Sequence, residues 1–294
     1  MPRTLVTGGY GYLGFRIVRR LREIGHTVTI LSRSPVETSA EKDWIHCDLA
    51  DRLATEKSLR GREFDFVIHA AATQETSQIK SSNVEGTRNL WDSLSPKPGR
   101  AVFLSTVHVY GPPENKITEL TKVQPVTLYA ESKRQGELIT LDSIENATIL
   151  RVSNAYGCPA KTEGAEWRLL TNDLIRSALR DKELHLHSDP HDARDFVWIE
   201  NVVDAITEIA TPGIFNCSAG STRTLGSIAE AVQKAGEKKL GREIRIRCDT
   251  ADPETPPPFS IYPEKLLSTI PLKIEDHLES EISRTFDFLI GTSQ

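Results

Sequence analysis

Short apolar runs alternate with segments of helical period along the first half of the 294-residue chain. Residues 3–7, 27–31, 43–47, 65–70, 100–105 and 147–152 are rich in β-branched and other apolar residues, which predicts strands. Between the first two runs, Leu13, Ile17, Leu21 and Ile24 recur with helical period, and helices are also predicted near 51–60, 79–94 and 128–143. A strand–helix alternation predicts a parallel sheet with helices on both faces, which is the doubly wound α/β class.

The second half of the chain is less regular. Residues 196–217 predict a strand, a helix and a strand that could extend the same sheet. We therefore expect a sheet-bearing domain of residues 1–157 plus about 196–217. A smaller, mixed α/β substrate-binding lobe is expected from 158–195 plus 218–294. In its last segment, Ile274, Leu278, Ile282 and Phe286 share one apolar stripe, which predicts a helix.

Composition narrows the possible partners and location. The net charge is −5, so the chain has no basic character suited to nucleic acid. It lacks an apolar run of roughly 18 residues, the length that a membrane span needs. Its start does not resemble a signal peptide, and its four cysteines form no CxxC pair. We expect a cytoplasmic protein with a small-molecule substrate and neither nucleic-acid nor membrane partners.

The stretch "TGGYGYLG", residues 7–14, follows a predicted strand and opens a predicted helix. Gly8 permits a tight turn, Gly11 lets the backbone approach a pyrophosphate, and Gly14 lets helix and strand pack closely. The helix N-terminus then offers N–H groups to the phosphates. This context predicts a dinucleotide-binding Rossmann domain.

The second strand ends in Ser32 and Arg33, where an acidic residue would bind a free ribose 2′-hydroxyl. An arginine can instead bind a 2′-phosphate, so NADP(H) is favoured over NAD(H); the alternative is an ordinary surface arginine. Asp48, after the third strand, is placed either to bind the adenine amino group or to cap the helix that begins near Asp51.

The segment "YAESK" places Tyr129 and Lys133 four residues apart, on one face of a helix. A tyrosine with a pKa of about 10 is a poor base at neutral pH. A neighbouring ammonium group lowers that pKa, which suits proton transfer coupled to hydride transfer. Ser105 and Thr106 end a predicted strand, where their hydroxyl groups could bond a substrate oxygen or cap the strand end.

The segment "HLHSDPHD", residues 185–192, raises the question of a metal site. His185 and His187 share one face of an extended segment. Their spacing fits no tetrahedral ligand pattern strongly, and hydride chemistry based on a tyrosine needs no metal. We expect a polar loop of the lobe here and no metal site.

Seven motifs in order resemble those of the extended short-chain dehydrogenase/reductases, the NAD(P)-dependent epimerase/dehydratase family. The resemblance covers residues 3 to about 217 and continues more faintly to the end. The motifs are "TGGYGYLG", "DFVIHAAA", "NVEGTRNL", "FLSTVHVYG", "YAESK", "LRVSNAYG" and "ARDFVWIENVVDAI".

The resemblance implies roles for single residues. Tyr129 would be the acid/base, Lys133 would hold the nicotinamide ribose, and Thr106 would bond the reacting oxygen. Asn154, Asn172 and Arg194 would contact the substrate, the arginine through a diphosphate and Asn172 through backbone groups. A homodimer built through the helices near 79–94 and 128–143 is also implied. The resemblance places Asn83 near the cofactor and adds further cofactor contacts at Tyr10, Tyr12, Leu13, Leu49, Ala70, Ala71 and Ala72.

Two departures from the family pattern limit the reaction. Val107 and His108 stand where 4,6-dehydratases have Asp and Glu, so dehydration is not expected; both residues would instead line the substrate site. His108 is either an additional catalytic acid/base or an ordinary packed imidazole. The second phosphate-binding arginine of the family is absent from its usual segment, and four arginines remain open as replacements: Arg168, Arg223, Arg245 and Arg247.

These features lead us to expect an NADP(H)-dependent oxidoreductase that reduces a C4 keto group of a nucleotide-activated sugar. The argument for reduction is the Ser32–Arg33 pair, because NADPH serves net reductions. The alternative is a nucleotide-sugar epimerase with retained NAD(P). A third reading is a cofactor-sensing protein without catalysis.

Overall fold

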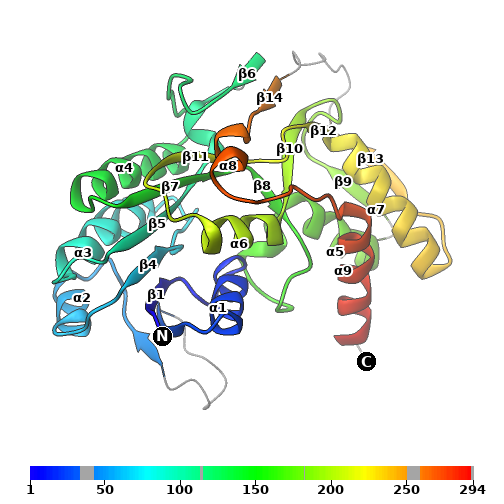
Figure 1. The fold of residues 1–294 in the computed structure, drawn as a ribbon. Helices are drawn as coiled ribbons and strands as arrows, with labels where there is room; N and C mark the ends of the chain where they lie inside the picture. The colour runs from blue at the N-terminus through cyan, green and yellow to red at the C-terminus, as the bar shows by residue number, and fades with distance from the viewer. Residues whose placement is uncertain (34–42, 113–114, 182, 250–258, 293–294) are drawn as a thin grey trace.

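The computed structural model describes residues 1–33, 43–112, 115–181, 183–249 and 259–292. Its centre is a seven-stranded sheet in which all neighbouring strands are parallel (Figure 1). Strand order across the sheet is β11 (Gly213–Cys217), β7 (Ala147–Val152), β5 (Arg100–Thr106), β4 (Phe66–His69), β1 (Arg3–Thr7), β2 (Thr27–Ser32) and β3 (Trp44–His46). The doubly wound α/β class predicted from the sequence is confirmed.

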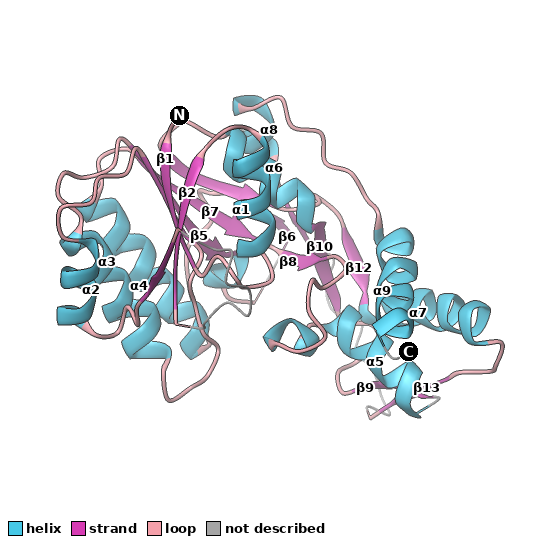
Figure 2. Cartoon of the chain, turned by 90° about the horizontal axis from the view of Figure 1, so that it is seen from below, coloured by secondary structure: helices cyan, strands magenta, loops and turns pink. Residues whose placement is uncertain are grey.

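Helices cover both faces of this sheet (Figure 2). One face carries α1 (Gly14–Glu23) and α6 (Ile199–Glu208), and the other carries α2 (Arg52–Leu59), α3 (Gly86–Ser93) and α4 (Leu128–Ser143). Successive side chains of a strand point to opposite faces. Leu5 and Val6 of β1 accordingly enter two different apolar clusters, and both are 0% exposed.

The segment 196–217 differs from its prediction. Strand β10 (Ala193–Trp198) does not join the main sheet but pairs with β8 (Asn154–Tyr156) and β12 (Thr222–Thr224). Of the two predicted strands, only β11 joins the main sheet. The reason is a buried carboxylate: Asp195 accepts hydrogen bonds from the Ser153 hydroxyl (2.6 Å) and the Ala219 N–H (2.8 Å). These bonds hold β10 beside β8.

Two predicted helices also differ from the structure. The segment predicted as a helix near 79–94 starts as a π-helical turn (Ile79–Glu85) and continues as α3. Helix α9 (Leu278–Thr292) begins after Ile274, so the predicted stripe loses its first member. The side chain of Asp276 accepts from the Leu278 N–H at 3.1 Å and thereby fixes the start of α9.

A second apolar cluster forms where α5 (Leu170–Asp181), α7 (Leu225–Leu240) and α9 pack together, with Ile175, Ile228 and Ile282 all 0% exposed. Strands β9 (Glu183–Leu186) and β13 (Arg245–Cys248) pair in parallel at its edge (Figure 2).

Two later elements fall in the segment expected in the smaller lobe but pack elsewhere. Leu266 of α8 (Glu264–Thr269) enters a core of the main sheet, and β14 (Phe259–Ile261) pairs with β6 (Asn115–Ile117). Within the described ranges, no helix has the length and apolar character required to cross a membrane.

Candidate active site

The glycine-rich turn between β1 and α1 is shaped by its glycines. Gly8 has a φ of 67°, and a Cβ there would lie 2.8 Å from the Cα of Ala71. A Cβ on Gly14 would overlap the carbonyl oxygen of Gly8. A side chain at Gly8 would therefore keep the loops after β1 and β4 apart, and a side chain at Gly14 would disrupt the turn between β1 and α1.

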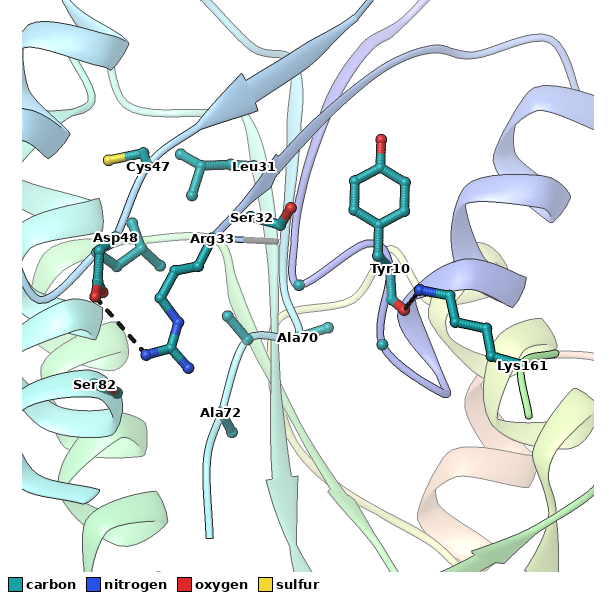
Figure 3. Close-up of a pocket in the computed structure, with 14 residues that line it drawn as sticks. Tyr10, Leu31, Ser32, Arg33, Cys47, Asp48, Ala70, Ala72, Ser82 and Lys161 are labelled. Carbon is teal, nitrogen blue, oxygen red and sulfur yellow. Dashed lines mark hydrogen bonds and ion pairs between the residues drawn. The ribbon is translucent and has the colours of Figure 1, made fainter. Parts of the chain in front are cut away.

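A cavity of about 260 Å³ opens at the carboxyl ends of β1, β2, β3 and β4 (Figure 3). Ligands of open α/β sheets bind at this edge. Ten residues predicted to bind the cofactor line it: Gly8, Tyr10, Gly11, Ser32, Arg33, Asp48, Leu49, Ala70, Ala71 and Ala72. Bare glycine backbone next to a helix N-terminus fits the phosphates of a nicotinamide dinucleotide.

Four further residues line the cavity and were not predicted from the sequence: Leu31, Cys47, Ser82 and Lys161. Leu31 and Cys47 directly precede two residues that we predicted to bind the cofactor, Ser32 and Asp48. Their positions at the ends of predicted strands could have identified them. Lys161 comes from the segment expected in the smaller lobe, and its Nζ donates to the carbonyl oxygen of Tyr10 at 3.3 Å.

Arg33, the predicted 2′-phosphate ligand, lies in this cavity close to an acidic neighbour. Its Nη1 is 3.8 Å from the Asp48 carboxylate and donates to the Gln78 side chain at 3.1 Å. Figure 3 shows the guanidinium directed at Asp48. Of the two roles left open for Asp48, the cap of α2 belongs to Asp51, which accepts from the Ala54 N–H at 3.0 Å.

Of the predicted catalytic residues, Thr106 lies farther along the same edge of the sheet, and Tyr129 and Lys133 lie on α4, which packs against β5. Thr106 ends β5, is 6% exposed, and accepts from the His108 N–H at 3.3 Å. Thr127 caps α4, which brings Tyr129 into the first helical turn and Lys133 into the next. None of Thr106, Tyr129 and Lys133 lines the cavity itself.

The electrostatics of this pair differ from the expectation. Burial raises the pKa of Tyr129 to about 12. Burial also lowers the pKa of Lys133 to about 8, against an opposing contribution from Glu137. The Lys133 Nζ lies 4.3 Å from the ring centroid of Phe103. The predicted lowering of the tyrosine pKa by Lys133 is therefore not seen in this arrangement, because burial alone accounts for the shift of the Tyr129 pKa.

Asn83 fixes the loop after β4 to α4, the helix that carries the predicted catalytic residues Tyr129 and Lys133. Its Oδ1 accepts from the Thr73 N–H at 2.8 Å, and its Nδ2 donates to the Thr73 carbonyl (2.9 Å) and to the Ser132 hydroxyl (3.0 Å). Ser132 in turn donates to the carbonyl of Tyr129 at 2.8 Å. The side chain of Asn83 thus connects the cofactor side of the cleft to the turn that carries Tyr129.

A buried ion pair between Glu137 and Arg151 joins α4 to the central sheet. Glu137 is 0% exposed and accepts from both Nε and Nη2 of Arg151, at 2.9 and 2.8 Å. It also accepts from Ser105 (2.5 Å) and Arg134 (2.8 Å). Although burial opposes it, this bonding holds the pKa of Glu137 below its ordinary value. The network ties α4 to β5 and β7 one turn beyond Lys133.

His69, at the end of β4, is buried between two threonines. Hydrogen bonds join its Nδ1 to Thr7 Oγ1 (2.6 Å) and its Nε2 to Thr87 Oγ1 (2.9 Å). Thr7 also accepts from the Ala71 N–H at 3.2 Å, so the imidazole stabilises both cofactor loops. Burial and the charge of Lys133 lower the pKa of His69 to about 3.

The predicted substrate residues are only partly brought together. The protein around His108 lowers its pKa by desolvation, and the nearby Arg194 guanidinium adds to the effect, so these two side chains face the same region. Asn154 donates to the carbonyl of Asp195 at 2.9 Å. Val107 and Asn172 are 6% and 2% exposed; Val107 packs in an apolar cluster, and Asn172 donates to the Glu166 carbonyl. Their side chains are therefore directed inward, away from a substrate.

The candidate replacements for the second arginine are all engaged in ion pairs. Arg168 pairs with Glu75 at 2.8 Å, and Arg223 pairs with Asp276. Arg245 and Arg247 pair with Glu243 and Glu183, at 3.9 and 3.6 Å. Arg194 has no ion pair with any residue that the structure describes, which leaves its guanidinium available to a ligand.

The start of α1 is bonded to the segment that follows β8. Tyr12, predicted to bind the cofactor, donates its hydroxyl to the Gly157 carbonyl at 2.6 Å. Arg16 pairs with Glu200 at 3.0 Å and donates to the carbonyl of Cys158. Leu13 packs on the core between α1 and the sheet rather than facing the cavity.

Comparisons with known proteins agree with this geometry. The model of a family described as NAD dependent epimerase/dehydratase matches residues 4–217. A putative UDP-arabinose 4-epimerase 4 of Arabidopsis thaliana is 28% identical, with 84% of this chain and 66% of that protein covered. The UDP-glucose 4-epimerase of Lactobacillus helveticus is 29% identical over 69% of this chain and 70% of that protein. The chain thus spans about two thirds of the length of these relatives.

A different activity also appears among the relatives: UDP-glucuronic acid decarboxylase 2 of Arabidopsis thaliana is 25% identical over 92% of this chain and 64% of that protein. Among solved structures, MoeE5 in complex with UDP-glucose and NAD superposes with a TM-score of 0.83 at 20% identity, covering 99% of this chain and 100% of that one. At this identity the likeness establishes the shared fold.

Proposed function

We propose that this chain, which belongs to the NAD dependent epimerase/dehydratase family, is a nucleotide-sugar 4-epimerase. The observation that carries the proposal is that Thr106 ends β5 at the sheet edge that also forms the dinucleotide cavity. Helix α4, which carries Tyr129 and Lys133, is bonded through Ser132 to Asn83, beside the loop after β4. Two of the relatives reported above are named 4-epimerases. They support the epimerase over the reductase that we favoured from the sequence.

Each catalytic residue has a distinct task in this proposal. A nicotinamide dinucleotide held by the cavity around Gly8, Gly11 and Ser32 would supply the hydride acceptor and donor that oxidation and re-reduction at C4 of the sugar require. Tyr129 takes the proton of the C4 hydroxyl and gives it back, and Thr106 donates a hydrogen bond to the same oxygen. Lys133, with a pKa of about 8, is mostly protonated at neutral pH. Its ammonium group favours the tyrosinate when the two side chains approach.

Arg194 and His108 define the substrate end of the cleft. An arginine without an ion pair among the described residues is suited to a diphosphate, to which it can donate two parallel hydrogen bonds. His108 has a lowered pKa and is neutral at pH 7, so it can accept a hydrogen bond from a sugar hydroxyl.

A reductase remains the second candidate because Arg33 lines the cavity. A 2′-phosphate beside Arg33 would favour NADP(H), the cofactor of net reductions. However, the Asp48 carboxylate 3.8 Å away would repel the same phosphate. We therefore propose NAD(H) as the resident cofactor of the epimerase. Arg33→Ala should then leave NAD(H) binding unchanged.

One experiment separates these candidates. The purified protein is tested for extractable dinucleotide and then incubated with UDP-, dTDP- and GDP-sugars, uronic acids included, without added cofactor. An epimerase interconverts C4 epimers with no net change in nicotinamide absorbance. A reductase instead consumes added NADPH in proportion to a 4-keto-sugar, and release of CO₂ from a uronate would indicate a decarboxylase. The epimerase proposal fails if no sugar is interconverted while NADPH is consumed.

We also propose that two copies associate through α4. Leu138 and Leu141 lie three residues apart on this helix and are 51% and 39% exposed, so they form a small apolar patch on one face of it. Light scattering of the wild type and of Leu138→Lys tests the association. A monomeric wild type would exclude it.

A further inference from the structure

Two histidines and an aspartate meet on the surface of the lobe formed by α5, α7 and α9. His185 lies on β9, His187 follows that strand, and Asp249 directly follows the paired strand β13. Asp249 bonds both imidazoles at once, with 2.6 Å to His185 Nε2 and 3.0 Å to His187 Nδ1. One nitrogen of each ring and one carboxylate oxygen all lie within 4.8 Å of one another.

We propose that His185, His187 and Asp249 form a binding site for a divalent transition-metal ion such as Zn²⁺. Neutral imidazole and carboxylate are ligands that Zn²⁺, Co²⁺ and Ni²⁺ share, whereas Mg²⁺ and Ca²⁺ prefer oxygen ligands alone. In a tetrahedral site with metal–ligand bonds of about 2.0–2.1 Å, the ligand atoms are separated by about 3.4 Å. The three side chains need only small rotations to reach that separation, and water completes the coordination.

The backbone preorganises these ligands. Leu184 and Leu186 are 0% and 1% exposed, so alternation along β9 directs His185 outward. The Asp249 N–H donates to the carbonyl of Leu186 at 3.2 Å, which holds the end of β13 against β9. The ligands therefore lie on β9 and directly after β9 and β13, two strands that pair in one register from Glu183–Arg245 to Leu186–Cys248.

One nearby charge opposes a cation. Arg247 is the register partner of His185 and therefore projects from the same face of the strand pair. Its guanidinium is directed to Glu183, at 3.6 Å, which offsets its charge and leaves Asp249 to the two histidines.

From the sequence we expected no metal site at residues 185–192, because that segment alone does not supply a tetrahedral ligand set. Asp249 lies 62 residues beyond His187 and is brought near by the pairing of β9 with β13. None of the three residues lines the dinucleotide cavity, so the inference is independent of the proposed function.

Metal titration of the untagged full-length chain tests the proposal. Isothermal titration with ZnCl₂ and CoCl₂ should give one saturable site, and Zn²⁺ should raise the melting temperature. Single substitutions His185→Ala, His187→Ala and Asp249→Asn should each weaken binding at least about tenfold, the loss typical of a disturbed metal site. The residues are exposed, so the variants should keep the wild-type circular dichroism.

A matched control is His277→Ala, because His277 also pairs with a carboxylate, Glu275 at 3.0 Å, but without a second histidine. It should bind Zn²⁺ as the wild type does. Cys248→Ser should do the same, since Cys248 precedes Asp249 on the opposite face of the strand. The proposal is overturned if the wild type shows no saturable binding, if binding survives all three ligand substitutions, or if Mg²⁺ competes equally.

Discussion

Replacement of Gly136 by alanine tests how closely α4 packs against Phe103, the ring that lies under the Lys133 ammonium group. Gly136 lies on the buried face of α4, three residues after Lys133. A Cβ at this position would overlap the tip of the Phe103 ring and lie 3.0 Å from its Cε2. The ring is 1% exposed and contacts His69 edge-to-face, with a centroid distance of 5.5 Å. It therefore has little room to move away.

We expect Gly136→Ala to lower the free energy of unfolding, whereas Gly→Ala at an open helical position usually raises it. Alanine in place of a helical glycine stabilises by up to ~1 kcal/mol when space is free. Overpacking of a filled core costs about 1–3 kcal/mol. The overlap with the Phe103 ring places the cost in the upper part of this range, about 2–3 kcal/mol, which leaves a net loss of about 1–2 kcal/mol. For a chain of this length that corresponds to a melting temperature lower by about 2–4 °C. Because Lys133 lies over the displaced ring, a shift on the order of 1 Å should also lower turnover by up to ~100-fold.

Gly291→Ala is the matched control, since Gly291 lies in α9 with nothing within 4 Å of its hypothetical Cβ. Thermal unfolding by calorimetry should show Gly136→Ala below the wild type and Gly291→Ala at or above it. If Gly136→Ala melted at or above the wild-type temperature with unchanged turnover, the packing argument for Phe103 and Lys133 would be refuted.

Three further predictions concern the buried polar groups. Tyr129→Phe should lower turnover by at least ~100-fold while NAD(H) binding, followed by fluorescence, is retained; equal loss of both would contradict an acid/base role. Breaking the buried Glu137–Arg151 pair with Glu137→Gln should cost about 3–5 kcal/mol in urea unfolding, and a cost under ~1 kcal/mol would argue against it. His69 titrates near pH 3 when folded but near its ordinary pKa when unfolded, so the unfolded chain binds the extra proton as the pH falls. The free energy of unfolding should therefore drop by about 2 kcal/mol from pH 6.5 to 5, and His69→Gln should abolish this part of the slope.

The sequence predicted those parts of the fold that depend on local pattern. Residues 147–152 are rich in apolar and β-branched residues, and the structure buries every residue of β7, Arg151 included. Gly8, Gly11 and Gly14 combine a motif with its strand–helix context, so the cavity around them was predictable. The helix over 128–143 was predicted with the bounds that the structure has.

Long-range polar contacts were not predictable in the same way. The departure of β10 from the main sheet depends on Asp195 meeting Ser153 and Ala219, which are distant in sequence. Glu137 occupies a fully buried position on α4 only because Arg151, from a neighbouring strand, neutralises it. Lys161 lines the cavity but lies in a loop, where the pattern of apolar residues does not predict how the chain is placed.

The bonds that join Tyr12 and Arg16 to Gly157 and Cys158 have a consequence for protein engineering. Arg16 is 4% exposed, and two acceptors of its guanidinium, the Glu200 carboxylate and the Cys158 carbonyl, lie more than 140 residues away in the sequence. A chimera that received its first 150 residues from this chain and the rest from a relative lacking those acceptors would bury a cation without a counterion, at a cost of several kcal/mol. Exchange of cofactor modules among such enzymes should therefore succeed only when the crossover carries these partners along.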